Sequence, residues 1–229
     1  MTTVIIVAAG KSERMGENVD KAFFPLGTSS KPVLAHTLRV MEQCHEIDKV
    51  VLVVRKDKVN SALGLVQLFG CKKVSKIVPG GANRQASVAA GLAACDEETT
   101  VVAVHDGARP CVTANLIAEV VRTAKAKGAA VAAMKITDTV KSSEKNNVIT
   151  DTIDRDKLWT VQTPQVFKIA ILRKALAKAD ADGYQYTDEA AAVEACGEQV
   201  HLVPTLHYNI KITYPEDMRT AALLLGIQS

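Results

Sequence analysis

Residues 3–16 read Thr-Val-Ile-Ile-Val-Ala-Ala-Gly-Lys-Ser-Glu-Arg-Met-Gly, and this stretch decides the fold. Its first half, Thr3–Ala9, is a short continuous apolar run, typical of a strand that is buried on both faces. Its second half is a loop of small residues that follows the strand directly. Open α/β sheets bind ligands at the carboxyl ends of their parallel strands. The stretch therefore predicts a parallel sheet whose first strand ends at a binding loop.

Apolar runs and helical patterns go on alternating as far as Lys135. The further runs predict buried strands at Lys49–Val54, Val74–Val78, Thr100–His105 and Ala129–Lys135. Between the runs lie predicted helices at Pro32–Cys44, Asp57–Leu68, Asn83–Cys95 and Thr113–Lys127, the last with Thr113 as N-cap and Gly128 as its stop. The alternation predicts a Rossmann-like α/β fold, in which a mostly parallel twisted sheet carries helices on both faces and the crossovers are right-handed.

The pattern changes after Lys135. Ile136–Ser142 and Val148–Ile153 read as two strands joined by the polar loop Ser143–Asn147, which is a hairpin signal. The hairpin has too little apolar surface for a core of its own, and an isolated hairpin is marginal in water. We therefore expect residues 136–155 to project as an arm that packs against a second copy of the chain. The alternative is a hairpin that lies on its own domain.

The last third of the chain adds a smaller set of predicted elements. They are a helix around Lys168–Ala179, a helix that starts at Thr187–Glu189, a strand near Val200–Pro204, an edge strand at Tyr208–Thr213 and a final helix from Pro215. Proline and acidic residues are favoured in a first helical turn, as in Pro215-Glu216-Asp217. No repeat or linker interrupts the chain, so we expect residues 1–229 to form one domain.

The composition narrows the class of protein. Of the 229 residues, 48% are hydrophobic and only 4% aromatic, so aliphatic side chains must fill the core. The net charge of +3 is spread along the chain without long runs of one sign, which argues against a nucleic-acid or membrane partner. Five cysteines without a Cys-x-x-Cys pair suggest reduced, buried thiols. The first residues lack the pattern of a signal peptide, so we expect a cytoplasmic protein.

The loop after the first strand has the character of a phosphate-binding site. Ala8, Ala9 and Gly10 let a base or a phosphate approach the backbone N–H groups. The loop matches neither the Walker pattern nor Gly-x-Gly-x-x-Gly, but Arg14 and Lys21 follow it closely. Two cations beside a loop of small residues suggest a polyphosphate clamp. The alternative is a tight turn with solvated basic residues.

Three later segments add polar groups at comparable places. Gly80–Ser87 joins a strand to a helix N-terminus, which favours contact with an anionic group, although a plain turn would read the same. Asp106 and Arg109 end a buried strand, where the aspartate can hold Mg²⁺ and the arginine can bind a phosphate. A structural ion pair is the alternative there, and His105 reads as a core histidine. Lys211 lies between aliphatic neighbours and is either directed at the site or solvated.

Together these segments resemble the 2-C-methyl-D-erythritol 4-phosphate cytidylyltransferase family along nearly the whole chain. The resemblance rests on an ordered set of motifs: Ala8-Ala9-Gly10-x-x-x-Arg14-Met15-Gly16 with Lys21, Gly80-Gly81-x-x-Arg84, His105-Asp106-x-Ala108-Arg109-Pro110, Asp138-Thr139-Val140-Lys141, Asp154-Arg155, Leu158-Trp159, Thr163-Pro164-Gln165, Thr187-Asp188-Glu189-Ala190 and Asn209-Ile210-Lys211. Two departures stand out. The family usually has proline and glutamine where Asp20 and Ala22 flank Lys21, and it often has an acid where this chain has Ala82.

The resemblance implies a reaction and roles for particular residues. CTP and 2-C-methyl-D-erythritol 4-phosphate would give 4-diphosphocytidyl-2-C-methyl-D-erythritol and pyrophosphate, a step of isoprenoid biosynthesis. Arg14 and Lys21 would stabilise the transition state, and Arg155, from the partner's arm in a homodimer, would position the attacking phosphate with Lys211. Asp106 would hold Mg²⁺ and contact both substrates. The residues implied to frame the cytidine are Ala8, Ala9, Gly10, Gly81, Ala82 and Ser87, and those implied to bind methylerythritol phosphate are Arg109, Thr139, Thr163 and Thr187.

Other functions fit parts of the pattern. Ribitol-5-phosphate cytidylyltransferases share the fold and several motifs, but the Ala108-Arg109 pair favours the methylerythritol branch. A non-catalytic nucleotide-binding module would keep the glycine turns and lose the cations, whereas Arg14, Lys21 and Lys211 are all present here. A Rossmann dehydrogenase is disfavoured because the third glycine of its fingerprint is missing.

Overall fold

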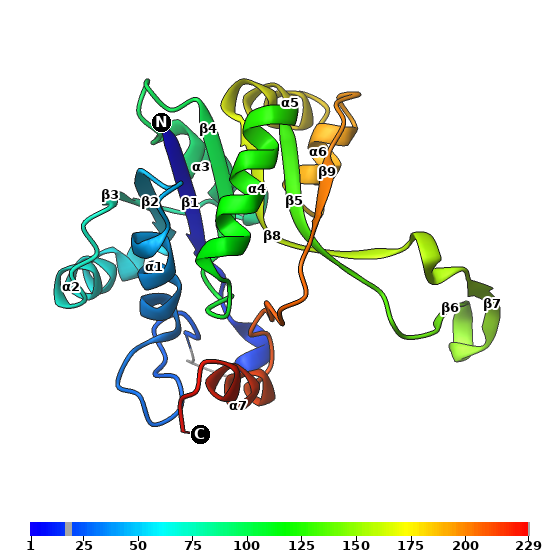
Figure 1. The fold of residues 1–229 in the computed structure, drawn as a ribbon, viewed down its shortest axis with the longest axis horizontal. Coiled ribbons are helices and arrows are strands. Elements are labelled where there is room, and N and C mark those ends of the chain that lie inside the picture. The colour runs from blue at the N-terminus through cyan, green and yellow to red at the C-terminus, as the bar shows by residue number, and fades with distance from the viewer. Residues whose placement is uncertain (17–19, 229) are drawn as a thin grey trace.

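The computed structural model describes residues 1–16 and 20–228 and contains a seven-stranded sheet with helices on both faces (Figure 1). The strand order is β3-β2-β1-β4-β8-β5-β9. The bounds of these strands are Thr2–Ala8 (β1), Lys49–Val54 (β2), Val74–Pro79 (β3), Val101–Asp106 (β4), Ala129–Lys135 (β5), Trp159–Lys168 (β8) and His201–Pro204 (β9). Neighbouring strands from β3 to β4 run parallel, as do β5 and β9, while β8 is antiparallel to both of its neighbours. The predicted mostly parallel α/β sheet is confirmed.

Two apolar cores, one on each face of the sheet, follow from the alternation of side chains along the strands. Val4 and Ile6 of β1 point into one core, and Ile5 points into the other. The first core is covered by α1 (Val33–Gln43), α2 (Val59–Leu68) and α4 (Ala114–Lys127). The second is covered by α3 (Arg84–Ala93), α5 (Ile169–Ala181) and α6 (Glu189–Glu194). Because both faces are covered, the strands are continuous apolar runs, which is why the sequence revealed them.

The helices end where their capping residues lie. The Thr113 hydroxyl accepts a hydrogen bond from the N–H of Leu116 at 3.2 Å, and Gly128 stops α4 with a φ of 100°. Asp188 caps α6 in the same way by accepting from the N–H of Ala191. The final helix, α7 (Pro215–Leu224), starts with proline as predicted. It packs on a third, smaller apolar cluster around Leu26, Val33, Ala108, Cys111 and Ile212.

Strand β8 was not predicted from the sequence. It lies in the middle of the sheet, and its Phe167 and Val166 are fully buried. The segment contains Pro164, and a proline argues against a central strand because it lacks an N–H donor. The pairing of β8 with β5 is irregular between the pairs Val131–Gln165 and Ala133–Val161. Pro164 lies in this interruption of the ladder, so its missing N–H costs no regular hydrogen bond there.

The predicted edge strand at Tyr208–Thr213 was wrong, because this segment is irregular. Single hydrogen bonds hold it in place instead of a ladder. The side-chain NH2 of Asn209 donates to the carbonyl of Thr163 at 2.7 Å, and the backbone N–H of Ile212 donates to the carbonyl of Ala108 at 2.9 Å. Ile212 is buried, whereas Lys211 faces the cavity. The segment therefore has the alternation of buried and exposed side chains that is typical of a strand, but no neighbouring strand among the described residues pairs with it.

The hairpin forms a two-stranded sheet of its own, β6 (Val140–Ser143) paired with β7 (Ile149–Ile153), each shorter than predicted. Figure 1 shows this arm extending away from the body beyond β5 and β9. Its turn contains Asn146 and Asn147 with φ of 71° and 58°, a conformation that asparagine tolerates. The arm is thus separate from its own core, as predicted, and its packing against a second copy stays a prediction.

Four short 3₁₀ turns complete the described elements, at Glu13–Met15, Lys56–Lys58, Lys145–Asn147 and Arg155–Lys157. The first of them carries Arg14, and the last carries Arg155 at the base of the arm. Within residues 1–16 and 20–228, none of the helices has both the length and the apolar character that crossing a membrane requires.

Candidate active site

A cavity of about 900 Å³ opens where the parallel strands β1 to β4 end. Four segments line it, and each directly follows or ends one of these strands: the loop after β1, the turn after β2, the glycine turn after β3 and the end of β4. Side chains from the irregular segment near Lys211 close it. The carboxyl ends of adjacent parallel strands meet at one edge of a sheet, so residues distant in sequence come together here.

Basic side chains dominate the lining of this cavity. Among the described residues, Lys11, Arg14, Lys21, Arg55, Lys56, Arg84 and Lys211 line it, against the acidic Glu13, Asp20 and Asp106. The structure therefore brings together Arg14 and Lys21, which follow the first strand, and Lys211, which the sequence singled out near the end of the chain. An excess of cations in one concave site favours an anionic ligand and raises its local concentration.

Asp106 lies at the centre of the charged groups. One carboxylate oxygen is 3.3 Å from the guanidinium of Arg84, and the other is 2.8 Å from the Nζ of Lys211 and 3.7 Å from the Nε of Arg109. Burial alone would raise the pKa of Asp106, but Arg84 and Lys211 hold it well below its usual value. Asp106 is therefore a fixed negative charge at neutral pH. The structural ion pair with Arg109, left open by the sequence, is present.

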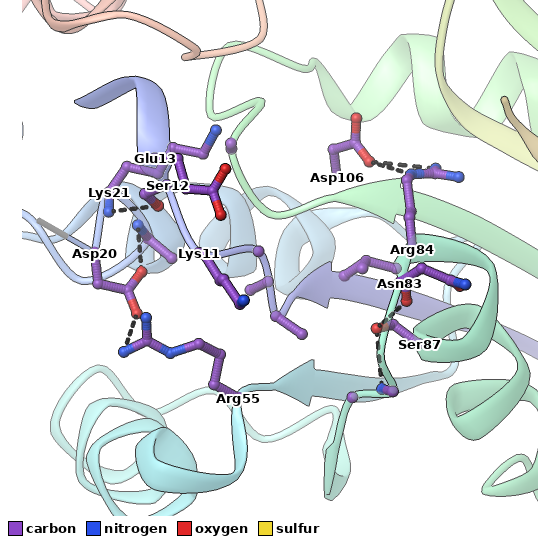
Figure 2. A pocket seen from close by; sticks show the side chains of 18 of the residues that line it. Lys11, Ser12, Glu13, Asp20, Lys21, Arg55, Asn83, Arg84, Ser87 and Asp106 are labelled. Carbon is purple, nitrogen blue, oxygen red and sulfur yellow. Dashed lines mark hydrogen bonds and ion pairs between the residues drawn. The ribbon is translucent and has the colours of Figure 1, made fainter. Parts of the chain in front are cut away.

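Arg84 was part of a quoted motif but was not predicted as a site residue. Figure 2 shows its side chain reaching into the cavity toward Asp106. Behind it, Glu189 is buried and accepts from Arg84 at 2.6 Å. Burial would lower the pKa of Arg84, but the carboxylates of Glu189 and Asp106 raise it, so this arginine stays charged. No local pattern distinguished this pair, because Glu189 at the start of α6 reads equally well as an ordinary first-turn acid.

Lys21 is held by two hydrogen bonds at the wall of the cavity. Its Nζ donates to the carbonyl of Ile212 at 2.8 Å, and its N–H donates to the Oγ of Ser12 at 3.3 Å. Burial, followed by the charges of Lys211 and Arg14, lowers its pKa. Mutual repulsion among these cations is relieved when an anion binds between them. The cluster is therefore arranged for a negative charge that arrives with the substrate.

The acid beside Lys21 is directed elsewhere. The carboxylate of Asp20 lies 3.5 Å from the guanidinium of Arg55, on the far side from Lys21 (Figure 2). Its other oxygen accepts from the N–H of Ala22 at 3.3 Å. The departure from the family pattern at residue 20 therefore places a carboxylate next to Arg55, not next to the amine of Lys21.

The loop after β1 and the glycine turn after β3 approach each other closely. A Cβ at Gly80 would lie 2.5 Å from the Cβ of Ala9, so only glycine fits between the two loops. Ser87 ties the glycine turn to its helix, because its hydroxyl accepts from the N–H of Gly81 and donates to the carbonyl of Asn83. The predicted cytidine-framing residues Ala8, Ala9, Gly10, Gly81, Ala82 and Ser87 all line the cavity. Ala82 offers no polar side chain, so any hydrogen bond there uses its backbone.

Of the residues predicted to bind the acceptor, Asp106 and Lys211 line this cavity, whereas Arg109, Thr139, Arg155, Thr163 and Thr187 do not. Arg109 is directed at Asp106 and at the carbonyl of Asn209, which accepts from it at 2.7 Å. Thr163 is buried behind Asp106, where its hydroxyl accepts from the N–H of Asp106 at 3.1 Å. Thr139, Arg155 and Thr187 are exposed, the first two on the arm and at its base. A single chain thus assembles the cation cluster, but it does not bring these five predicted acceptor-binding residues to the lining of its own cavity.

A magnesium site was predicted at Asp106. In the described part of the chain, His, Cys, Asp and Glu side chains do not gather in threes where they could hold a metal ion. A single buried, ionised carboxylate at the rim of a cavity lined by cations nonetheless suits Mg²⁺, which takes one or two carboxylates together with substrate phosphates. The donor chemistry fits, and Mg²⁺ at Asp106 stays a prediction.

Comparison with known sequences places these features in a family. The sequence profile of 2-C-methyl-D-erythritol 4-phosphate cytidylyltransferase matches residues 2–226. The enzyme of that name from Alkaliphilus metalliredigens is 42% identical over 217 residues, which cover 94% of this chain and 89% of the relative. The one from Bacillus cytotoxicus is 39% identical over 228 residues, covering 100% and 99%.

Solved structures give the same result at the level of the fold. A 4-diphosphocytidyl-2C-methyl-D-erythritol synthase from Anaerococcus prevotii superimposes with a TM-score of 0.85 at 29% identity, covering 98% of this chain and 96% of that one. The 2-C-methyl-D-erythritol 4-phosphate cytidylyltransferase from Thermus thermophilus gives 0.79 at 32% identity, covering 98% of both chains. The chain therefore belongs to the 2-C-methyl-D-erythritol 4-phosphate cytidylyltransferase family of nucleotidyltransferases.

Proposed function

We propose that this chain transfers the cytidylyl group of CTP to 2-C-methyl-D-erythritol 4-phosphate, giving 4-diphosphocytidyl-2-C-methyl-D-erythritol and pyrophosphate. One observation carries the proposal beyond family membership. Arg14 and Lys21, Asp106, and Lys211 come from three distant parts of the chain and line one cavity together with the loop after β1 and the glycine turn after β3. This arrangement matches the chemical problem, which is to bring two phosphate-bearing molecules together. We place the reaction in the cytoplasm, as the sequence predicts.

The chemistry is an in-line displacement. An oxygen of the acceptor phosphate forms a bond to the α-phosphorus of CTP, and the bond from that phosphorus to the bridging oxygen of the β-phosphate breaks. Pyrophosphate leaves with the bonding electron pair. The acceptor needs no general base, because a phosphate monoester with a second pKa of about 6 is largely dianionic at pH 7. Catalysis then consists of positioning and of stabilising charge on the α-phosphate.

The residues of the cavity divide this work between them. Arg14 and Lys21 stabilise the charge that grows on the α-phosphate, and Lys211 draws the attacking phosphate toward it. Asp106 keeps Lys211 in place by their 2.8 Å contact. The backbone of the two loops, from Ala8 to Gly10 and around Gly81, accommodates the cytidine. Because Arg84 is held by Glu189, it keeps the carboxylate of Asp106 oriented and ionised.

Magnesium would be held by Asp106 and the phosphates of CTP. When bound, the ion supplies charge neutralisation, which matters because two unit charges about 4 Å apart interact by roughly 4 kcal/mol at an effective dielectric of 20.

The acceptor site requires a second copy of the chain. Thr139 and Arg155 are exposed and do not line the cavity of their own chain. The arm to which they belong extends away from the body (Figure 1). The exposed Val148 and Ile149 near the tip of the arm offer apolar surface to a partner. We therefore place Thr139 and Arg155 in the cavity of the partner subunit, next to the acceptor phosphate. Arg109, Thr163 and Thr187 remain proposed acceptor contacts, the first two through their positions around Asp106.

A pyrophosphate-release assay with CTP tests the proposal. Methylerythritol phosphate and ribitol phosphate are supplied as alternative acceptors. The proposal expects release with methylerythritol phosphate and little with ribitol phosphate. The opposite preference would assign the chain to the ribitol branch. Release with neither, by protein that binds CTP, would indicate a non-catalytic nucleotide-binding module.

A further inference from the structure

Asp20 and Arg55 form an ion pair between two segments of the cavity wall. Asp20 belongs to the segment that carries Lys21, whereas Arg55 directly follows strand β2. The side chain of Asp20 is only 9% exposed and that of Arg55 is 29% exposed. Oδ2 of Asp20 has no hydrogen bond and faces the guanidinium of Arg55 at 3.5 Å. A nearly buried carboxylate therefore depends on this arginine for compensation of its charge.

Asp20 also shapes the turn on which Lys21 lies. Its Oδ1 accepts from the N–H of Ala22, and its carbonyl accepts from the N–H of Phe23 at 3.0 Å. Aspartate is favoured at the first position of such turns because its side chain reaches the backbone two residues on. One oxygen of Asp20 thus stabilises the turn, and the other is attracted to Arg55. The carboxylate fixes the turn relative to the sheet.

Arg55 is supported in turn by Asp57. The carboxylate of Asp57 accepts from Arg55 at 3.2 and 3.0 Å, but its side chain is 64% exposed and does not line the cavity. Exposed pairs of this kind contribute little to stability. Asp57 is therefore a matched control for Asp20, because it touches the same guanidinium from the solvent side.

We infer that the Asp20–Arg55 pair sets the position of the Lys21 amine, which makes Arg55 and Asp20 positioning residues for the transfer reaction. The inference rests on the proposed function, in which Lys21 stabilises the α-phosphate. Lys21 is otherwise anchored by its contacts with Ile212 and Ser12. Neither contact reaches the β2 side of the cavity. The Asp20–Arg55 ion pair is a third anchor, on the β2 side, and it therefore fixes the distance between the turn that carries Lys21 and the nucleotide.

The competing explanation is that Arg55 binds the nucleotide itself, since it lines the cavity. The two roles differ in what they change. A direct ground-state contact affects the Kd and KM for CTP, and its loss leaves turnover intact. A positioning role affects kcat, because Lys21 acts on charge that develops in the transition state. Asp20, being acidic, cannot bind a triphosphate directly, so an equal effect of Asp20 and Arg55 variants separates the two.

The kinetic test uses Asp20→Asn, Arg55→Met and the double variant, with Asp57→Asn as control. Asparagine keeps the oxygen that accepts from Ala22 and replaces the charged oxygen that faces Arg55 with an uncharged NH2 group. We expect kcat to fall about tenfold in either single variant and no further in the double variant, because both changes break one interaction. The Kd for CTP should stay within about twofold of wild type. Asp57→Asn should retain wild-type kcat, and thermal unfolding is followed for every variant to exclude loss of the fold.

A second readout does not depend on turnover. The amine of Lys21 is followed by NMR in lysine-labelled protein without substrates, with its signal assigned from Lys21→Arg. Burial and the neighbouring Lys211 and Arg14 lower its pKa, so displacement of the turn should move that pKa back toward its ordinary value. We expect this in Asp20→Asn and Arg55→Met, and not in Asp57→Asn.

The outcomes separate the two claims. An unchanged Lys21 titration together with unchanged kcat in both variants would overturn the inference. So would a weaker Kd for CTP with kcat spared in Arg55→Met alone, or losses that add in the double variant. Wild-type protein without transfer activity would overturn the proposed function, while the titration of Lys21 would still decide whether the pair positions the amine.

Discussion

The Nζ of Lys211 lies 2.8 Å from a carboxylate oxygen of Asp106, and through this contact the irregular segment after β9 is joined to the end of β4. The same carboxylate meets Arg84 on its other oxygen. One buried acid thus organises cations from two other parts of the chain. Such an arrangement has a predictable dependence on charge and on pH.

Replacing Asp106 with asparagine should abolish most activity and destabilise the fold. The carboxylate is the shared partner of Arg84, Arg109 and Lys211, and removal of one member of a buried ion pair typically costs about 3–5 kcal/mol. Arg84 and Lys211 retain partial access to water, so we expect the lower end of that range. Urea unfolding at pH 7 measures the loss, and an unchanged midpoint would contradict the assignment.

The stability difference between wild type and Asp106→Asn should itself depend on pH. Because the pKa of Asp106 is lowered in the folded state, its contribution is complete above the unfolded pKa of about 3.9 and declines as the pH falls below that value. Unfolding curves at pH 7, 5 and 3 should therefore show a gap that is constant between pH 7 and 5 and narrower at pH 3. A gap that widens at pH 3 would show the sign to be wrong.

Lys21→Ala should lower turnover on the order of 10²–10³-fold while CTP still binds, because one transition-state donor is lost. The amine is fixed by the carbonyl of Ile212, so Lys21→Arg, with a longer and planar group, should not restore full activity. Steady-state kinetics with calorimetric CTP titration checks both statements. Turnover near wild type in Lys21→Ala would remove this residue from the mechanism.

Tyr214 should contribute to catalysis through Arg14. The guanidinium carbon of Arg14 lies 5.5 Å from the centroid of the Tyr214 ring, within the range of a cation–π interaction. Such contacts are worth about 0.5–1 kcal/mol at exposed positions, or about two- to fivefold in rate. Tyr214→Leu should lower kcat by that factor and Tyr214→Phe should not, since only the ring is needed. Equal losses in both would point to the hydroxyl instead.

His105 should stay neutral throughout the physiological range. It is fully buried, its Nδ1 lies 3.1 Å from the Thr163 hydroxyl and its Nε2 lies 3.3 Å from the carbonyl of Arg109. Burial lowers its pKa to about 4. The unfolded imidazole binds a proton below about pH 6.5, so this residue's contribution to stability is complete above pH 6.5 and is lost as the pH falls toward 4. An NMR titration that showed His105 protonating near pH 6.5 would contradict this.

Mixed dimers test whether the sites are shared between subunits. Arg14 lines the cavity, whereas Arg155 lies at the base of the arm. If Arg155 serves the partner's cavity, co-expressing Arg14→Ala and Arg155→Ala subunits should leave one intact site in each mixed dimer. Activity that no mixture regains would mean that each chain completes its own site. Dual affinity tags isolate the mixed species, and each variant alone serves as control.

The buried parallel strands could be predicted because they are continuous apolar runs, and the helix ends because Thr113 and Gly128 have defined capping chemistry. Strand β8 could not, since Pro164 and its polar neighbours satisfy their needs through an irregular pairing that only the tertiary structure supplies. The segment around Lys211 shows the reverse error: it has the alternation of a strand but no partner to pair with.

The residues of the candidate site also differ in whether local sequence or the tertiary structure determines their role. Residues on the loops directly after β1, β3 and β4 were predicted because the ends of parallel strands converge, and the structure places them around one cavity. Arg55 and Glu189 were missed because their importance lies in partners, Asp20 and Arg84, that are distant in sequence. No local pattern around Arg55 marks it as paired with a buried acid.

The most direct test of the central claim follows the label from CTP. Wild-type protein is incubated with methylerythritol phosphate and either α-³²P- or γ-³²P-labelled CTP, with Asp106→Asn as control. We expect the α-label to appear in the cytidylylated alcohol and the γ-label in pyrophosphate, with both transfers strongly reduced in the variant. Transfer of the γ-label to the alcohol phosphate, or equal transfer by Asp106→Asn, would contradict this expectation.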